Sequence, residues 1–163
     1  MLTIDLNPGN TLSVLRALSN PGNAQRIANV AAESYVDDML DWIDGGHSFT
    51  GRTGQLQQSI GWRSVLNGSS EVYANARYAT YVEKGTGIHA GHQSWIIGPK
   101  SGRKAIRFNV SGGAGYVIRR RITHKGSQAK PFFFTDLASR GQHMQEESLS
   151  VLAALAGSGH GNV

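Results

Sequence analysis

The clearest periodic pattern in the chain is amphipathic and lies over residues 21–44. Apolar side chains recur there at helical spacing, and the acidic residues mostly fall on the opposite side. Asn20 can cap the first turn, Pro21 suits the first helical position, and Gly45-Gly46 can end the helix. The pattern therefore predicts one long helix with an acidic solvent face. Its apolar positions are Ala28, Ala32, Val36, Met39 and Ile43.

A second long helix is predicted from Pro131 to about Ala156. Proline suits the first turn of a helix, and Phe132–Phe134 would then staple that turn to a sheet. Gly141 interrupts the pattern and is a candidate kink. Apolar points follow along the segment at Leu137, Met144, Leu149, Leu152 and Leu155.

Shorter patterns lie between the two helices. "TGQLQQSI" predicts a short helix that Thr53 caps. Asn67-Gly68 favours the left-handed turn of a β-hairpin, and β-branched and aromatic residues flank it. "ARYATYVE" predicts one or two helical turns, which Gly85 closes with a left-handed exit.

Three strands are predicted in the second half of the chain, in "SWIIGP", "KAIRFNV" and "YVIRRRIT". The last is interpreted as a single strand that pairs with "AIRFNV". Because neighbours in a strand point to opposite faces, Arg119 and Arg121 would share one face and Arg120 the other. The pair would form a basic hairpin.

The order of these elements predicts an α+β fold with a mixed or antiparallel sheet. A long N-terminal helix and a long C-terminal helix would pack on the sheet, and the basic β-hairpin would extend from it. Residues 1–19 are expected to form an N-terminal arm, in which Leu12, Leu15 and Leu18 lie on one helical face. Residues 20–156 would form a single domain with a basic loop and hairpin insertion over 87–128, and 157–163 a flexible tail.

Composition narrows the class of protein. A chain of 163 residues suits one compact domain, and 21 glycines indicate long loops beside the core. The absence of cysteine excludes a disulfide scaffold and a thiolate zinc site. No apolar run reaches membrane-spanning length, so no membrane partner is expected. The N-terminus lacks the order of charge and apolarity that a secretory signal has.

Charge is distributed unevenly along the chain. Residues 99–130 hold nine basic and no acidic side chains, whereas residues 1–50 hold two basic and six acidic ones. The basic segment is either an exposed hairpin without a partner or a polyanion surface. In the second case it would touch a nucleic-acid backbone by charge alone, without reading bases. The residues expected to face DNA or another polyanion are Arg107, Arg119, Arg120, Arg121 and Lys125.

No set of residues has the pattern of a catalytic site. His89 and His92 offer too few ligands for a metal, and "GPKSGRK" lacks the spacing of a phosphate-binding loop. His47 stands beside a serine, but outside any nucleophile pattern. We therefore expect no enzymatic activity, no metal and no cofactor.

Three segments together resemble the tail-completion (neck, minor-tail) family of long-tailed bacteriophages. They are "TGQLQQSI", "YATYVEKGT" and "AKPFFFTDL". The resemblance spans about residues 20–156, and the basic region 87–128 departs from the family's pattern. A related family of virion morphogenesis proteins has a similar Pro-Phe motif. The matching positions are Thr53, Gly54, Leu56, Ser59, Tyr78, Ala79, Val82, Glu83, Gly85, Thr86, Ala129, Pro131 and Phe132.

The resemblance implies a structural protein of the virion, made in the cytoplasm of the host bacterium. It implies a ring, with six copies as the natural number, at the head–tail junction or the upper end of the tail. The viral DNA would pass through that ring without sequence preference. Neighbouring head-closure or adaptor proteins and tail-terminator or tail-tube proteins would be the other partners.

Several residues are expected at contacts between subunits. Tyr78 and Tyr81 are amphipathic and lie on one face of a short helix, although Tyr78 equally suits a core. Glu83 at the end of that helix requires a compensating cation. The charge asymmetry suggests that the acidic helix of one copy faces the basic hairpin of the next. The interface candidates are Tyr78, Tyr81, Glu83, Thr86, Phe132, Asp37 and Asp41.

Two alternatives remain at this stage. One is a protein that binds nucleic acid independently of sequence, or a virion morphogenesis or assembly protein. The other is a stand-alone nucleic-acid-binding regulator, which would form a small dimer with a preferred site.

Overall fold

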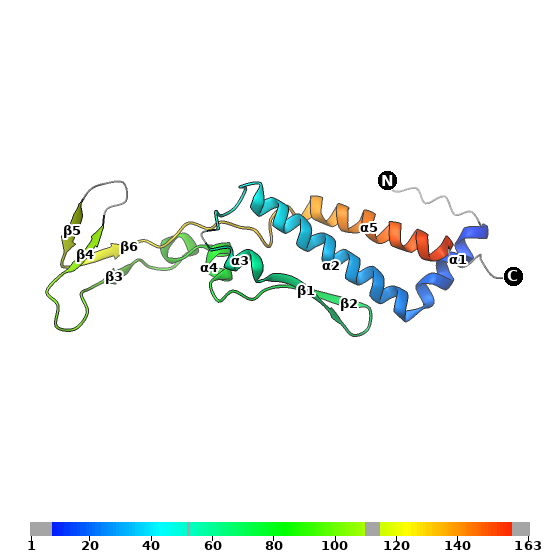
Figure 1. The fold of residues 1–163 in the computed structure, drawn as a ribbon, viewed down its shortest axis with the longest axis horizontal. Coiled ribbons are helices and arrows are strands. Elements are labelled where there is room, and N and C mark those ends of the chain that lie inside the picture. The colour runs from blue at the N-terminus through cyan, green and yellow to red at the C-terminus, as the bar shows by residue number, and fades with distance from the viewer. Residues whose placement is uncertain (1–7, 52, 110–114, 158–163) are drawn as a thin grey trace. The chain divides into compact units, whose positions relative to one another are not determined.

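The computed structural model describes residues 8–51, 53–109 and 115–157, which form two compact units (Figure 1). Unit 1 comprises the described residues up to Arg77 and those from Phe132 onward, and unit 2 comprises Tyr78–Pro131. Unit 2 is thus inserted, in chain order, between the two segments of unit 1. The expectations for residues 1–7 of the N-terminal arm, for Val110 at the end of a predicted strand and for the tail beyond Gly157 lie outside the described residues.

Three helices form most of unit 1: α1 (Pro8–Ser19), α2 (Pro21–Asp44) and α5 (Leu137–Gly157). In Figure 1, α5 runs along α2, and α1 lies against the ends of both. The side chain of Asn20 accepts a hydrogen bond from the Gly22 N–H at 2.9 Å and so caps α2. Gly46 ends α2 with a φ of 76°. Its N–H and that of the next residue bond back to the last turn in a Schellman arrangement.

A β-hairpin covers α2 on its other side. The short helix α3 (Gln55–Gln58) precedes β1 (Ile60–Val65), which pairs with β2 (Ser69–Ala74) in antiparallel register. Asn67 and Gly68 both have positive φ, which confirms the predicted hairpin turn. The Gln25 side chain of α2 holds this turn, because it accepts from the Gly68 N–H and donates to the Ser69 carbonyl. Unit 1 is therefore layered as hairpin, α2 and α5.

The core of unit 1 lies between these layers. Met39 and Phe132 are its most buried large side chains, at 0% and 1% exposure. Burying an apolar side chain of this size contributes about 1.5–3 kcal/mol to folding. Phe132 stacks edge-on against Phe49, with ring centroids 5.5 Å apart. The other buried apolar side chains of unit 1 are Ala17, Ala32, Val36, Ile43, Leu56, Ile60 and Ala156.

The prediction that the last helix begins at Pro131 is wrong, because α5 begins at Leu137. The buried Arg140 explains the difference. Its Nη1 donates to the carbonyls of Phe132 and Phe133, at 2.9 and 3.2 Å, and so holds that segment outside the helix. Asp136 has a φ of 50°, which also interrupts helical geometry just before α5. The helix is continuous through Gly141, where a kink was a candidate.

The described residues of unit 2 form two short helices and four short strands. They are α4 (Ala79–Lys84), the 3-10 helix η1 (Gly87–Ala90), β3 (Trp95–Ile97), β4 (Ile106–Asn109), β5 (Tyr116–Arg119) and β6 (Ile122–His124). β3 pairs with β6 and β4 pairs with β5, both antiparallel. Together with β1–β2, the described residues form three separate two-stranded sheets rather than one.

The interpretation of "YVIRRRIT" as one strand is wrong. β5 ends at Arg119, β6 begins at Ile122, and the two strands belong to different sheets. Arg120 and Arg121 form the connection between them, so the three arginines do not alternate along a single strand.

At the coarser level, the predicted α+β class, the long C-terminal helix and the antiparallel pairing are confirmed. No helix among the described residues combines the length and the hydropathy that crossing a bilayer requires.

Candidate assembly and polyanion-binding surfaces

Two segments of unit 2 lie backbone to backbone, and we call them the glycine clasp (residues 85–88 and 125–130). The Thr86 N–H donates to the Ser127 carbonyl at 2.9 Å, and the Ile88 N–H donates to the Lys125 carbonyl at 2.9 Å. The Thr86 hydroxyl in turn accepts from the Ser127 N–H at 2.8 Å. The clasp thus joins the beginning and the end of the strand region of unit 2.

Glycine is required in the clasp because the two backbones leave no space for a side chain. A Cβ on Gly126 would lie 1.9 Å from the Thr86 carbonyl oxygen, and one on Gly87 would lie 2.3 Å from the Lys125 carbonyl oxygen. Gly85, with a φ of 72°, would place a Cβ 2.7 Å from the backbone of the opposite segment. Gly85 has the positive φ that the predicted left-handed exit requires, but its ψ of −172° lies outside the left-handed helical region.

A pocket of about 310 Å³ opens beside the clasp, within unit 2. Two aromatic rings border it, those of Tyr81 and Trp95, which are 62% and 48% exposed. Lys84 and His92 add polar and cationic groups to its lining. We call it the Tyr81–Trp95 pocket. A concave site between exposed rings is suited to receive an apolar side chain.

The predicted interface residues divide between the two units. Tyr78 and Tyr81 are exposed, Glu83 is half-buried on α4, and Thr86 uses its hydroxyl inside the clasp. Phe132 lies in the core of unit 1. Their roles at subunit contacts stay predictions.

Unit 2 exposes most of its large apolar side chains. Among its described residues only Ala79, Gly85 and Gly87 are buried. Ile96 is 69% exposed, although it lies in the continuous apolar run of β3. A strand that is apolar on both faces is normally covered on both. The surface of unit 2 therefore has the chemistry of a contact surface rather than of a solvated loop.

The five predicted polyanion contacts are all exposed but do not share one face. Arg107 lies on β4 opposite Ile118, and Arg119 lies on β5 opposite Ile106, so the two arginines project from opposite faces of the sheet. Lys125 belongs to the glycine clasp. The Arg107 guanidinium lies over the Tyr116 ring, 3.9 Å from its centroid. Arg120 and Arg121 follow in the β5–β6 connection.

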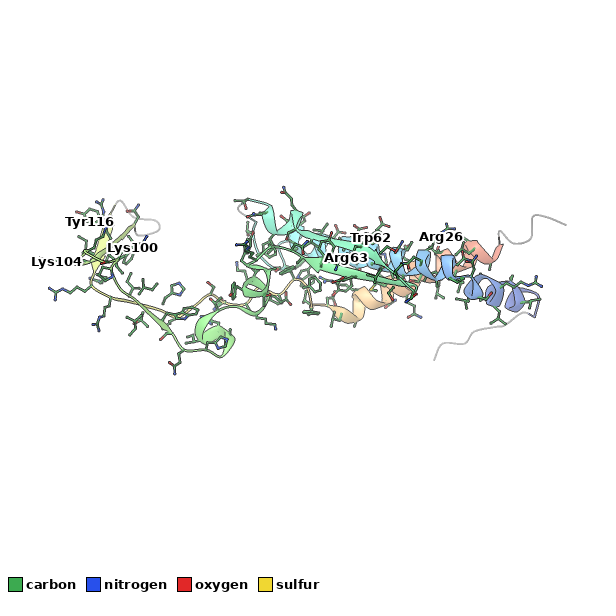
Figure 2. All side chains as sticks on the ribbon, turned by 90° about the horizontal axis from the view of Figure 1, so that it is seen from below. Arg26, Trp62, Arg63, Lys100, Lys104 and Tyr116 are labelled. Carbon is green, nitrogen blue, oxygen red and sulfur yellow. The ribbon has the colours of Figure 1, made fainter. Side chains whose placement is uncertain are left out.

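Further lysines extend the basic character of unit 2. In Figure 2, Lys100, Lys104 and Tyr116 lie toward the same end of this unit. In sequence, unit 2 holds ten basic and one acidic side chain, hence +9, and unit 1 holds six and ten, hence −4. The basic charge therefore surrounds the strands of unit 2 instead of forming a flat patch.

The acidic residues of unit 1 are concentrated on α2. Asp37 and Asp41 are exposed there, as the predicted contact between copies requires. The neighbouring Asp38 is occupied within the unit, because its carboxylate meets His143 Nδ1 of α5 at 2.8 Å. Asp44 accepts a hydrogen bond from the Gln57 side chain at 2.7 Å.

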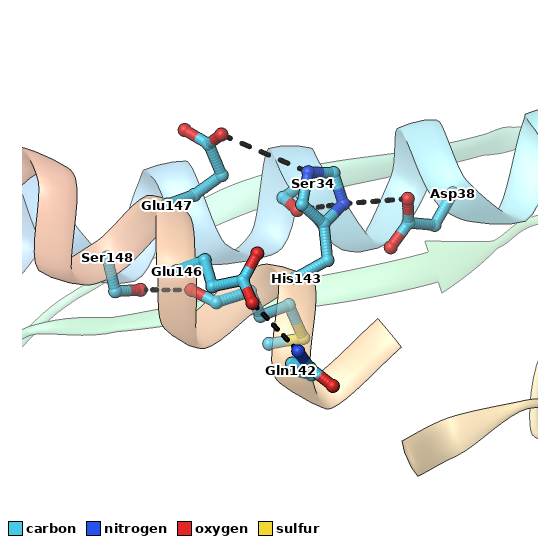
Figure 3. Close-up of polar contacts among 8 residues, drawn as sticks. Ser34, Asp38, Gln142, His143, Glu146, Glu147 and Ser148 are labelled. Carbon is cyan, nitrogen blue, oxygen red and sulfur yellow. Dashed lines mark hydrogen bonds and ion pairs between the residues drawn. The ribbon is translucent and has the colours of Figure 1, made fainter. Parts of the chain in front are cut away.

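Ser34, His143 and Asp38 come together between α2 and α5 (Figure 3). The residue types match a catalytic triad, but the geometry does not. His143 Nδ1 faces both the Ser34 hydroxyl, at 3.2 Å, and the Asp38 carboxylate, whereas a triad uses the two ring nitrogens for these two tasks. Ser34 is also only 6% exposed. The cluster therefore ties the helices together.

The pKa of His143 is raised above its ordinary value of 6.5. The main cause is the hydrogen bond from the ring to Asp38, followed by the charge of that carboxylate. Glu147 adds to the effect, with its carboxylate 3.9 Å from His143 Nε2.

Sequence reasoning missed the structural role of Arg140 and the exposure of β3. Arg140 is the only lysine or arginine of α5. Its isolation in the sequence was the one signal that it could be a buried donor to carbonyl groups. Nothing in the sequence indicates that Trp95, Ile96 and Ile97 are left exposed. Within the described ranges, no group of three or more His, Asp or Glu side chains is placed to hold a metal ion.

A family model described as "Bacteriophage HK97-gp10, putative tail-component" matches residues 20–85, which is less than half of the chain. The match covers α2, α3 and the β1–β2 hairpin of unit 1, and it ends in unit 2 at the first glycine of the clasp. That part of the chain is thus similar to a phage tail component, in agreement with the family that the sequence motifs indicated. Comparison with curated proteins and with solved structures gave no match.

Proposed function

We propose that this chain is a structural virion protein of a tailed phage. It assembles with copies of itself into a ring at the head–tail junction or at the upper end of the tail, and the viral DNA passes through the ring. Head-closure or adaptor proteins and tail-terminator or tail-tube proteins are its neighbours. The observation that carries this proposal is the match of residues 20–85 to a phage tail component.

The surface of unit 2 supports self-assembly. Two-stranded sheets are marginally stable without something packed on them, and both sheets of unit 2 expose apolar side chains. A surface of one copy that packs on a different surface of the next makes a heterologous contact. Such contacts generate a closed ring when the rotation between copies closes.

Charge supplies a direction for that contact. The acidic face of α2, with Asp37 and Asp41, belongs to the unit with net charge −4, and Arg119 and Arg121 belong to the unit with net charge +9. Opposite charges across an interface steer association and fix its register. In this proposal, α2 of one copy faces the basic strands of the next.

Native mass spectrometry of the purified full chain tests this arrangement. The wild type should form a closed oligomer, with six copies as the natural number. A variant with Asp37→Lys and Asp41→Lys should stay monomeric, as should one with Arg119→Glu and Arg121→Glu. A mixture of the two variants should assemble again, with the variants in alternating order, because the reversed α2 face of one is complementary to the reversed strands of the other.

A matched control is Glu146→Lys, which changes an exposed acid on α5 and should leave assembly unchanged. If both charge-reversed variants assembled as the wild type does, the charge pairing would be wrong. Absence of the chain from purified particles, examined by electron microscopy and mass spectrometry, would overturn the structural function itself.

A second candidate function is contact with the DNA backbone, which the ten basic side chains of unit 2 favour. Binding to a random duplex measured over a salt series should show a steep loss of affinity as salt rises, because each neutralised phosphate releases a counterion. Replacing Arg119, Arg120 and Arg121 with Gln should reduce that slope by about 3. A flat salt response would exclude this function.

A further inference from the structure

We propose that the Tyr81–Trp95 pocket of one copy receives the segment Phe134–Leu137 of a second copy. The inference rests on the self-assembly proposed above and assigns it a contact site. It concerns a different surface from the charged α2 face, and it identifies the apolar anchor of the contact.

The pocket is built to hold an apolar side chain beside an acid. The Tyr81 and Trp95 rings line its 310 Å³, and Gly85 and Gly87 of the clasp border it on either side of Thr86 without side chains of their own. Lys84 stands in the lining, at the last turn of α4. Interfaces concentrate their binding energy at such places, where an aromatic-lined hollow excludes water around one inserted group.

Unit 1 presents a segment of matching chemistry. Phe134 is 65% exposed, and Leu137 is also exposed, with the exposed acid Asp136 between them. The segment leads into α5, whose first residue is Leu137, and the two carbonyls just before the segment accept hydrogen bonds from Arg140. An exposed aromatic side chain on a fixed backbone costs little entropy when it inserts into a partner.

Local charge favours this occupant over the other exposed apolar segments of unit 1. Leu149 on α5 has Glu146 and Glu147 nearby, but these carboxylates already meet Gln142 and His143 of the same helix. Leu12, Leu15 and Leu18 lie on α1, which carries no acid. Leu66 is exposed at the hairpin tip, and the nearest acid along the chain is Glu71. That carboxylate is already paired with Arg63 at 2.6 Å. Phe134–Leu137 places a carboxylate between two apolar groups, where it can meet Lys84 of the pocket.

The contact is heterologous, because the pocket belongs to unit 2 and the inserted segment to unit 1. Each copy therefore offers one pocket and one segment, and can bind two neighbours at once. This is the arrangement that a ring of identical copies requires.

The absence of cysteine from the chain permits a clean test by crosslinking. One variant carries Thr80→Cys in the pocket lining, and the other carries Thr135→Cys beside Phe134. Neither change removes a proposed anchor. Mixed under mild oxidation, the two variants should form a disulfide-linked dimer, because docking brings the two Cα atoms within about 7 Å. A matched control pairs Thr80→Cys with Leu66→Cys, whose exposed side chain lies outside the proposed contact.

The outcomes separate the two proposals. A mixed dimer well above the control yield supports the pocket. An oligomer that forms without this crosslink overturns the docking and leaves the ring in place. A double variant that crosslinks within one chain at high dilution shows that the pocket holds its own segment, which also overturns the proposal. A chain that stays monomeric at all concentrations overturns both proposals.

A second measurement assesses the anchors without cysteines. Trp95→Ala and Phe134→Ser should each weaken self-association at least about tenfold in dissociation constant, as expected for a buried anchor. The double variant should be little weaker than either single one, because the two side chains act on each other. Fully additive losses in this cycle would contradict direct contact.

Discussion

Unit 1 buries Met39 and Phe132 between its layers, whereas unit 2 buries only Ala79, Gly85 and Gly87 among its described residues. Their stability therefore has different origins. Unit 1 is held by apolar side chains that its own helices and hairpin remove from water. Unit 2 is held by backbone hydrogen bonds of the glycine clasp and by two short sheets.

This difference assigns different tasks to the two units. A layered core positions the acidic face of α2 without help from any partner. A unit without a core keeps its aromatic and aliphatic side chains available for another surface, and unit 2 also carries most of the basic charge. A substitution in unit 1 should therefore destabilise the whole unit, whereas one in unit 2 should act only near its own position. The following measurements test this difference.

The largest effect is expected from Phe132→Ala in the core of unit 1. It should lower the free energy of unfolding by about 3–5 kcal/mol, because a fully buried ring leaves a cavity. Urea denaturation followed by tryptophan fluorescence measures the change. Leu66→Ala is the control, with an expected change within about 0.5 kcal/mol, since that side chain is exposed. Equal losses in the two variants would contradict the proposed core.

The next largest effect is expected from Gly126→Ala in the clasp. The new Cβ would overlap the Thr86 carbonyl, so the two segments must separate at a cost of about 2 kcal/mol or more. Hydrogen exchange should accelerate at the Thr86 and Ile88 amides and stay unchanged in α2. Gly91→Ala is the matched control, because Gly91 also has positive φ but open space around it. Loss of protection throughout unit 1 would show that the units unfold together.

A smaller effect is expected from pH, through His143 in unit 1. Since the folded-state pKa is raised above 6.5, the ion pair with Asp38 stabilises the fold fully below that pH and fades as pH rises through the raised value. The midpoint of urea unfolding should therefore fall to a lower urea concentration when the pH is raised from about 6 to about 8. In His143→Gln this part of the pH dependence should vanish. A wild-type profile that is flat across this range would contradict the ion pair.

The smallest effect on stability is expected from Ile96→Thr in unit 2. Since Ile96 is already largely exposed, the free energy of unfolding should change by no more than about 0.5 kcal/mol. Threonine also preserves the β-branched shape that suits a strand. Thermal denaturation of the monomer measures this. A loss above 1 kcal/mol would show that β3 is covered within the chain, and the comparison between the units would fail.

The sequence predicted best where a local signal decides the structure. Asn67-Gly68 sets a hairpin turn by backbone geometry alone, and the predicted apolar positions Ala32, Val36, Met39 and Ile43 are all buried on α2. The Pro131 error has a longer-range cause. The Phe132 carbonyl is bonded to Arg140, eight residues away, and no periodicity reports such a bond.

Predictions for the candidate surfaces were limited by the same lack of long-range information. The residue pattern of "YVIRRRIT" is typical of one strand. It does not show that the chain pairs with β4 up to Arg119 and with β3 from Ile122 onward. The sequence indicates that Gly85 ends a helix. It does not indicate that the Gly85 backbone lies against Ser127 and Ala129, which come more than forty positions later.

The glycine clasp has a consequence for how this molecule can vary. The two segments that flank the stretch 89–124 are bonded to each other through their main chains, and these bonds involve no side chain of the stretch. A sequence of another length or charge could replace this stretch, and the clasp would still hold its two ends side by side. The clasp would then be a constant attachment point, and the segment between its two halves could differ in the surface that it presents.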